Sequence, residues 1–177
     1  MTDFATVGDL IRFLASTAET ASDEGLPFSE LDHGLQCAYE LQIAAPDDEE
    51  LQVAGLVHDV AHTLGSIENH GEVGARLVEP SLGARVAALV EGHVPAKRYL
   101  VAVDPEYSAL LSADSVRTLA IQGGALSPEE ITAWEARPHW RESVELRRAD
   151  DRAKTPGRVV PALEYWIPRL QAVAAGR

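Results

Sequence analysis

The chain has 177 residues, of which 46% are hydrophobic, and its only cysteine is Cys37. This length suits one ordinary domain with its own core, and a single cysteine excludes an intrachain disulfide. The formal charge of −13, from 28 acidic and 15 basic residues, gives a surface that repels phosphate backbones, so we expect no nucleic-acid partner.

The sequence shows no apolar stretch of the roughly 20 residues that a membrane-spanning helix needs. Its N-terminus also lacks a basic region followed by a long apolar run, which is the pattern of a secretory leader. We therefore expect a cytoplasmic protein without a membrane partner. The acidic surface does not oppose a small anionic substrate, because bound metals and a few lysines make a site locally positive.

The N-terminal part predicts a series of helices. Apolar residues at helical spacing indicate an amphipathic helix over residues 9–21, and residues 22–27 break it. Ser29 and Asp32 resemble a capping box that opens a second helix. Residues 46–48 end that helix and open a third, which runs into a His-Asp pair.

Two further helices are predicted over residues 73–77 and 82–90, separated by Pro80 and Gly83, and the second would end near His93. In the last third of the chain, residues 122–124 predict a turn.

Residues 140–154 form a charged amphipathic segment, and residues 159–175 predict a final helix. The sequence contains no run of alternating apolar and polar residues, no internal repeat and no linker. We therefore predict an all-α fold in which residues 1–177 form one domain.

The stretch from residue 55 to residue 70 contains three of the six histidines, His58, His62 and His70, together with Asp59. These polar groups follow an apolar run, where they are costly unless something binds them. A metal ion is the simplest partner, and the carboxylate of an adjacent His-Asp pair can hold one ion and bridge to a second.

Six residues at or near the ends of predicted helices complete this pattern: His33, His58, Asp59, His70, His93 and Asp150. Helix bundles build metal sites by projecting side chains from several helices into a shared interior. Nitrogen and carboxylate ligands without thiolate suit iron, manganese or zinc. Four imidazoles and two carboxylates suffice for two metals with open coordination positions.

Some residues keep more than one interpretation. His62, one helical turn after His58, is a metal ligand, a hydrogen-bond donor behind a ligand or a substrate contact. His139 follows a proline in a polar stretch and is interpreted as an ordinary surface histidine. The Asp150–Asp151 pair is either a solvated acidic face or a source of one ligand.

The order His33, His58-Asp59, Asp150 resembles the HD-domain superfamily, most of which are metal-dependent phosphohydrolases. Narrower motifs between residues 31 and 154 resemble the mixed-valent diiron oxygenases that cleave the carbon–phosphorus bond of 2-amino-1-hydroxyethylphosphonate and its N-methylated relatives, a branch related to myo-inositol oxygenase. These motifs are Leu31-Asp-His33-Gly-Leu-Gln36, His58-Asp-Val-Ala-His62, His93-Val-Pro-Ala-Lys97-Arg-Tyr-Leu100, Ser112 to Ser115, Gln122-Gly-Gly, and Leu146-Arg-Arg-Ala-Asp150-Asp-Arg-Ala-Lys154.

The resemblance implies two iron ions in a mixed-valent Fe(II)/Fe(III) pair, with dioxygen as co-substrate. One iron would be held by His33, His58, Asp59 and Asp150, and the other by His70, His93 and the bridging Asp59. Asp150 is preferred over Asp151 because it stands four residues before Lys154, as the last ligand of myo-inositol oxygenase stands before a lysine.

The resemblance also implies a small anionic hydroxylated substrate, a phosphonate that is cleaved oxidatively with release of phosphate. Lys97 and Ser115 match residues that contact the phosphonate, and His62 matches a catalytic histidine near the substrate. The family's aminophosphonate-cleaving members carry a tyrosine and a glutamate in the loop before the first histidine. Here residues 22–28 contain no tyrosine, and Glu24 is the only glutamate, so the amino end of the substrate is open.

Two alternatives remain from the sequence. A phosphohydrolase of the HD type would split a nucleotide or phosphate ester at a metal-bound hydroxide, but many such enzymes carry a lysine soon after the His-Asp pair, and here none occurs before Lys97. A non-enzymatic scaffold or metal sensor is disfavoured because all six candidate ligands are present.

Overall fold

The structure is a computed structural model that describes residues 4–20, 28–64 and 68–176. Within these residues every regular element is a helix and none is a strand, so the predicted all-α fold is confirmed. The α-helices are α1 (Val7–Ser16), α2 (Glu30–Ala44), α3 (Glu49–Val57), α4 (His70–Leu82), α5 (Ala84–Val103), α6 (Ala113–Ile121), α7 (Pro128–Glu135), α8 (Trp140–Arg152) and α9 (Leu163–Ala175). Short 3-10 helices are η1 (Thr17–Glu19), η2 (His62–Leu64) and η3 (Tyr107–Leu110).

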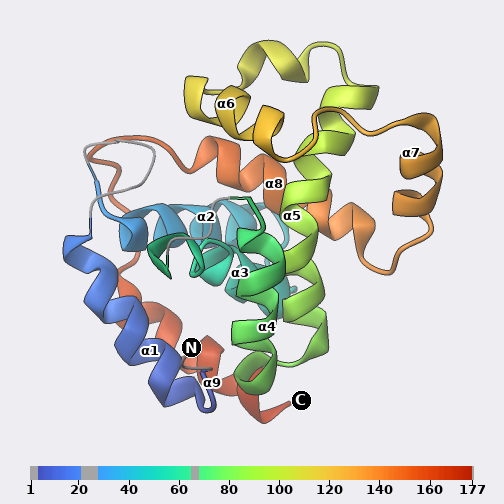
Figure 1. Cartoon of the computed structure of the whole chain (residues 1–177). Coiled ribbons are helices and arrows are strands. Elements are labelled where there is room, and N and C mark those ends of the chain that lie inside the picture. Colours follow the sequence, from blue (N-terminus) through green and yellow to red (C-terminus); the bar gives the residue numbers. More distant parts are fainter. Residues whose placement is uncertain (1–3, 21–27, 65–67, 177) are drawn as a thin grey trace.

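The long helix α5 is central to the arrangement, because it packs against α3, α4 and α8. Helix α2 packs against α3 and α8, while α1 and α9 lie side by side. Figure 1 shows α1 and α9 at one end of the molecule and α6 at the opposite end. Helices α2, α3, α4, α5 and α8 therefore surround the middle of the molecule, where the candidate ligands are expected.

Local sequence signals set several helix starts. Ser29 and Asp32 form a reciprocal capping box at the start of α2, as predicted. The side chain of Asp48 accepts a hydrogen bond from the backbone N–H of Leu51 and caps α3. These caps satisfy N–H groups that have no partner within the helix, and the one at Ser29 fixes where His33 lies along α2.

Two prolines do not end helices where the sequence suggested. Pro80 lies inside α4, and α5 continues past Pro95 to Val103, so His93 lies within this helix and not at its end. The break between α4 and α5 is at Gly83, whose φ of 86° suits glycine. The cost of Pro95 is offset by the packing of α5 against three neighbouring helices.

Other boundaries also differ from the prediction. The first helix ends at Ser16 and continues only as η1, and the last helix begins at Leu163, so residues 159–162 are not helical. Helices α6 and α7 were not predicted, because prolines and glycines around them obscure two short amphipathic segments. The turn at residues 122–124 is confirmed, with positive φ at Gly123 and Gly124.

The buried apolar residues form two clusters. The larger one joins α1, α2, α3, α4, α9 and parts of α5 and α8. The smaller one lies around Leu100, Tyr107 and Trp134 and joins the C-terminal half of α5 to α7 and η3. In the described part of the chain no helix is both long enough and apolar enough to cross a bilayer.

A close approach between α2 and α3 brings two candidate ligands together. A Cβ atom added to Gly34 would lie 2.5 Å from the backbone carbonyl oxygen of Leu56, so any side chain there forces the helices apart. The neighbouring residue His33 consequently has its ring 5.0 Å from that of His58. The absence of a side chain at Gly34 therefore lets α2 and α3 approach closely enough to bring these two rings together.

Candidate metal centre

The six predicted ligands come together from four helices and from the turn that follows α3. His33 lies in α2, His70 is the first residue of α4, and His93 lies within α5. His58 and Asp59 directly follow α3, and Asp150 lies in the last turn of α8. Side chains separated by up to 117 positions thus share one interior site, as in other helix bundles that hold metals.

One oxygen of Asp59 faces the first group of candidate ligands. Its Oδ2 lies 3.1 Å from His58 Nε2 and 3.4 Å from His33 Nε2. Asp150 Oδ1 lies 3.2 Å from His33 Nε2 and 3.8 Å from His58 Nε2. Two imidazole nitrogens and two carboxylate oxygens therefore converge on one point.

The other oxygen of Asp59 faces the second group. Its Oδ1 lies 3.5 Å from both His70 Nε2 and His93 Nε2, and these two nitrogens are 2.8 Å apart. Potential ligand atoms of Asp59, His70 and His93 all lie within 4.8 Å of one another, and the same holds for His33, His58 and Asp59. Asp59 is thus the residue shared by both groups.

Backbone carbonyls orient three of these imidazoles. The Nδ1 atoms of His33, His58 and His93 lie 3.0, 2.8 and 2.6 Å from the carbonyl oxygens of Ala153, Gly55 and Val90. A carbonyl only accepts, so each Nδ1 carries a proton, and in the neutral imidazole each Nε2 presents a lone pair to the interior. This is the usual arrangement behind a metal-ligating histidine.

The convergent atoms fit a metal cation better than any other partner. His33 Nε2, His58 Nε2 and Asp59 Oδ1 are buried and have no hydrogen-bond partner among the residues that the structure describes, although buried polar groups are normally paired. Lone pairs that face each other across about 3 Å repel unless a proton or a cation lies between them. The donor set of nitrogen and carboxylate oxygen, without thiolate, suits iron, manganese or zinc.

The electrostatics of the protein alone agree with this interpretation. Burial lowers the pKa of His33, but Asp150 and Asp59 outweigh burial and raise it to about 9. Burial raises the pKa of Asp59, yet His58 and His62 hold it well below its usual range. Both Asp59 and Asp150 are therefore ionised at neutral pH, as ligands of a cation must be.

Beside the two ligand groups lies a small cavity with basic and hydroxyl groups on its walls. Lys97, which is 3% exposed, donates a hydrogen bond from Nζ to Thr118 Oγ1 at 2.8 Å. Ser115 and Arg147 also line this cavity. The predicted contacts Lys97 and Ser115 therefore lie together next to the metal ligands.

Arg147 was not singled out from the sequence, although it is 4% exposed and lines the cavity. Its Nη1 lies 2.8 Å from Asp150 Oδ2, and its other nitrogens contact Asp151. The spacings of three and four residues along a helix were the available signal. The two aspartates differ in what they face. Asp150 faces the ligand group and also contacts Arg147, whereas Asp151 contacts Arg147 and is not among the candidate ligands.

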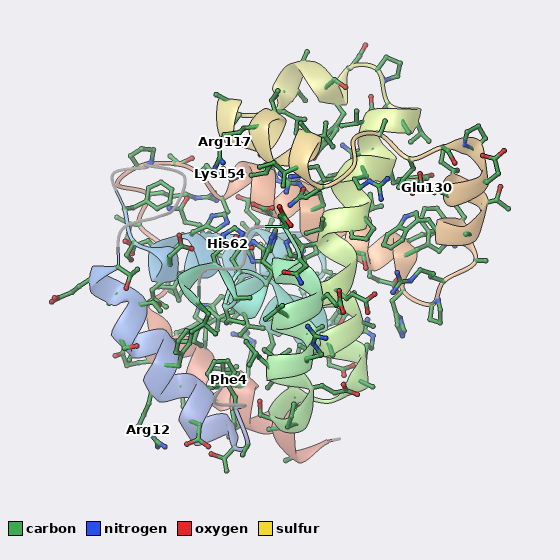
Figure 2. All side chains as sticks on the ribbon, viewed as in Figure 1. Phe4, Arg12, His62, Arg117, Glu130 and Lys154 are labelled. Carbon is green, nitrogen blue, oxygen red and sulfur yellow. The ribbon has the colours of Figure 1, made fainter. Side chains whose placement is uncertain are left out.

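His62 lines the same cavity, but, contrary to what the sequence had suggested, it does not share a helical face with His58. Helix α3 ends at Val57, so His62 does not continue a helical face from His58; it begins η2 after a turn. Its Nδ1 is 3.7 Å from Asp59 Oδ2, and its ring is 4.1 Å from that of His70. Figure 2 shows His62 among the central helices, while Arg12 and Glu130 lie at the periphery. His139 is at the start of α8, beside Glu142 and outside the site.

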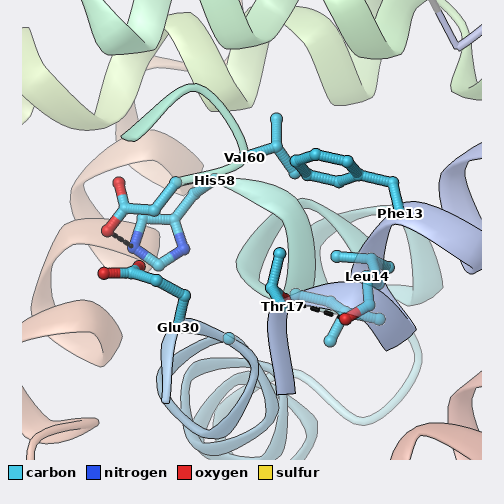
Figure 3. Close-up of a pocket in the computed structure, with 9 residues that line it drawn as sticks. Phe13, Leu14, Thr17, Glu30, His58 and Val60 are labelled. Atoms are coloured by element: carbon cyan, nitrogen blue, oxygen red, sulfur yellow. Dashed lines mark hydrogen bonds and ion pairs between the residues drawn. The ribbon is translucent and has the colours of Figure 1, made fainter. Parts of the chain in front are cut away.

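A second small pocket approaches His58 and Asp59 from the side of α1. Figure 3 shows Phe13 and Val60 on its walls and Glu30 with its carboxylate toward His58. Ligand atoms of Glu30, Asp59 and His62 lie within 4.8 Å of one another. Glu24, the only glutamate of residues 22–28, lies outside the described residues.

Comparison with known proteins identifies the relatives of the chain. The HD domain family model matches residues 29–150. The hydroxymethylphosphonate dioxygenase of Gimesia maris is 34% identical over 179 aligned residues, covering 94% of this chain and 87% of that protein. The [1-hydroxy-2-(trimethylamino)ethyl]phosphonate dioxygenase (glycine-betaine-forming) of Leisingera caerulea is 29% identical, over 93% of this chain and 90% of that protein.

An uncharacterized protein of Acanthamoeba polyphaga mimivirus is 35% identical over 68% of this chain and 60% of its own length. The matched HD-domain region contains all six candidate ligands and ends at the last of them, Asp150. The paired histidine and aspartate clusters suit metal binding, and both named relatives are dioxygenases. The chain therefore belongs to the HD-domain family, within the branch of metal-dependent phosphonate oxygenases.

Proposed function

We propose that this protein is a dioxygenase that cleaves the carbon–phosphorus bond of a small 1-hydroxyphosphonate and releases phosphate. The observation that carries the proposal is Asp59, whose two oxygens face two separate groups of buried ligands. A shared carboxylate of this kind suits a two-metal centre. The basic cavity beside it suits a dianionic substrate.

The proposed cofactor is a pair of iron ions in the Fe(II)/Fe(III) state. His33, His58, Asp59 and Asp150 would hold one ion, and His70, His93 and Asp59 the other, as their distances to the Asp59 oxygens suggest. When bound, these irons supply the redox chemistry with dioxygen. The two carboxylates offset only part of their charge, so the centre stays cationic and favours the substrate's hydroxyl and phosphonate oxygens.

The residues of the chain bind and orient the phosphonate in this proposal. Lys97, Ser115 and Arg147 line one cavity and offer an ammonium, a hydroxyl and a guanidinium. His62 lies across this cavity beside Asp59 and holds or moves a proton at the substrate's hydroxyl group. Burial of these groups excludes water and strengthens their attraction for an anion.

The overall reaction balances with one molecule of dioxygen. A 1-hydroxyphosphonate, R–CH(OH)–PO₃H₂, plus O₂ gives R–COOH and H₃PO₄. The carbon–phosphorus and carbon–hydrogen bonds break, carbon is oxidised by four electrons, and dioxygen accepts them. Each product gains one oxygen atom, so no external reductant is needed in the net reaction.

The proposal is tested with iron-loaded, partly reduced protein and a panel of substrates that includes hydroxymethylphosphonate and 1-hydroxy-2-(trimethylamino)ethylphosphonate. We expect oxygen uptake and phosphate release in a one-to-one ratio with at least one of them. Low-temperature paramagnetic resonance should show a coupled Fe(II)/Fe(III) pair. Absence of oxygen uptake, together with hydrolysis of phosphate esters under anaerobic conditions, would instead identify a phosphohydrolase.

The pH dependence should report the charge of Lys97. Burial, followed by the nearby positive charges of Arg147 and Lys154, lowers its pKa to about 8 despite the carboxylates of Asp150 and Asp151. Lysine is a cation below its pKa, and bound metal cations push that pKa lower still. We therefore expect kcat/KM for the phosphonate to fall as pH rises, with the decline beginning no higher than about pH 8.

The control is Lys97→Arg, because a guanidinium stays charged throughout this range. Whatever activity this variant keeps should lack the decline near pH 8. An identical decline in the variant would show that another group causes it, and would contradict the assignment of Lys97 as the phosphonate-binding cation.

A further inference from the structure

Tyr107 and Asp151 form a hydrogen-bonded pair behind the basic cavity. Tyr107, in η3, is 3% exposed, and its hydroxyl donates to Asp151 Oδ2 at 2.5 Å. Arg147 Nε donates to the Tyr107 hydroxyl oxygen at 3.1 Å and lies 3.2 Å from Asp151 Oδ2. Arg147 and Asp151 lie four residues apart on α8, whereas Tyr107 is 40 and 44 residues away from them, so the contact of Tyr107 with the other two is tertiary and not local.

Each of the three guanidinium nitrogens of Arg147 has a hydrogen-bond or ion-pair partner. Its Nη1 faces Asp150 Oδ2 at 2.8 Å, and its Nη2 contacts Asp151 Oδ1 and donates to Ser115 Oγ at 3.3 Å. A guanidinium is planar, with donors in a fixed fork. Contacts at Nε and at both terminal nitrogens therefore determine the plane in which it lies.

The pair also gives Arg147 a second carboxylate partner besides Asp150. Asp150 is a candidate metal ligand, and an arginine that paired with it alone would compete with the metal for its oxygens. Asp151 offers a second carboxylate that is not among the candidate ligands, and Tyr107 fixes that carboxylate by donating to it. Arg147 is thus held between two carboxylates, with Nη2 directed toward Ser115 on the cavity wall.

The segment that carries Tyr107 is itself attached to α8. Asp104 accepts hydrogen bonds from the backbone N–H of Tyr107 and from Arg148. The guanidinium of Arg148 also lies 6.0 Å from the centre of the Tyr107 ring. These contacts hold Tyr107 against α8, where its hydroxyl oxygen accepts the hydrogen bond from Arg147 Nε.

We propose that Tyr107 and Asp151 are positioning residues that hold the Arg147 guanidinium in the orientation required to bind the substrate's phosphonate group. This inference rests on the proposed function. The two residues do not touch the substrate; they act through Arg147. A long arginine side chain loses rotamer freedom when it binds an anion, and the pair restricts that freedom before the substrate arrives.

The test compares Tyr107→Phe with wild type in the iron-loaded enzyme. We expect KM for the phosphonate to rise about tenfold while kcat falls less than twofold and the iron content stays unchanged, as for loss of one hydrogen bond to a charged group. The affinity for methylphosphonate, a probe that lacks the reactive hydroxyl, should fall by the same factor in calorimetry.

A second variant, Asp151→Asn, keeps the side-chain shape and should give the same rise in KM and the same loss of methylphosphonate affinity. If the pair acts as a unit, the double variant should be no worse than the more affected single variant. Asp151→Asn also keeps the test valid if Tyr107→Phe fails to fold.

Tyr99→Phe is the matched control, because Tyr99 also donates to a carboxylate, Glu135 Oε1 at 2.8 Å, but on the exposed side of α5. We expect its KM and probe affinity to equal those of wild type. Unchanged methylphosphonate affinity in both Tyr107→Phe and Asp151→Asn, or loss of iron in either, would overturn the inference. Failure of wild-type protein to bind methylphosphonate would instead reject the phosphonate pocket of the proposed function.

Discussion

Replacing Asp59 with alanine is expected to remove both iron ions together. Each oxygen of Asp59 faces a different pair of histidines, at 3.1 and 3.4 Å on one side and at 3.5 Å to both on the other. Without this carboxylate, each group loses a ligand and the two groups lose their link. The remaining imidazoles also lose the negative charge that offsets two buried cations.

The measurement is iron content by elemental analysis after reconstitution, together with the paramagnetic resonance signal. We expect less than one iron per chain and no coupled signal. Turnover should fall by more than roughly 100-fold, because loss of a residue behind a metal ligand alone costs about 10–100-fold and Asp59 would itself be a ligand.

Asp48→Ala is the matched control, because Asp48 caps the start of the same helix that ends beside Asp59 and also pairs with Arg85 at 2.6 Å. Losing this cap should lower the free energy of unfolding by roughly 0.5–2 kcal/mol without loss of iron. An Asp59→Ala protein that keeps one tightly bound iron would show that the two groups are independent and that Asp59 does not bridge them.

Prediction from the sequence was most accurate for helix starts and for ligands whose position depends on short-range interactions. The capping box at Ser29 places His33 in the first turns of α2, and Pro46 and Asp48 separate α2 from α3. The adjacent His58 and Asp59 follow α3, so their proximity required no tertiary information. For these residues the local signal and the fold agree.

The errors lie where tertiary packing outweighs local preference. The helix that carries His93 was predicted to end near that residue, and Pro95 follows two positions later, where a proline inside a helix costs roughly 3 kcal/mol. In the structure α5 continues to Val103 because it packs against α3, α4 and α8. Burial against several neighbours outweighs that local cost, and nothing in the local sequence reports those neighbours.

The least predictable part of the site is the network around Arg147. Tyr107, Ser115 and Asp151 contact this guanidinium from separate elements. Only the spacing of Arg147 from Asp150 and Asp151 along one helix is visible locally. The orientation of η3 against α8 decides the rest, and that orientation is a property of the assembled bundle.

Replacing His62 with alanine should leave both metals bound and abolish most turnover. His62 lies in the basic cavity, and its Nδ1 is 3.7 Å from Asp59 Oδ2. Its Nε2 is buried and without a hydrogen-bond partner in the described part of the chain. The four other imidazoles already supply two nitrogens on each side of Asp59, so neither group needs His62 as a ligand.

We therefore expect unchanged iron content and a fall in kcat of about 10²–10⁴-fold, the usual range for loss of a proton-transfer group. Added imidazole should restore part of the rate, because it can occupy the vacated space and carry the proton. The control is His139→Asn, since His139 lies at the surface start of α8 with φ of 60°, which asparagine tolerates.

His139→Asn should match wild type in iron content and rate. A metal-free His62→Ala protein would assign His62 to the metal centre, where the cluster of Glu30, Asp59 and His62 offers it two carboxylate neighbours. Retained iron with lost, imidazole-rescued turnover would place it on the substrate side. The two outcomes thus separate ligand from catalyst at the one histidine of the stretch from residue 55 to residue 70 whose role the sequence left open.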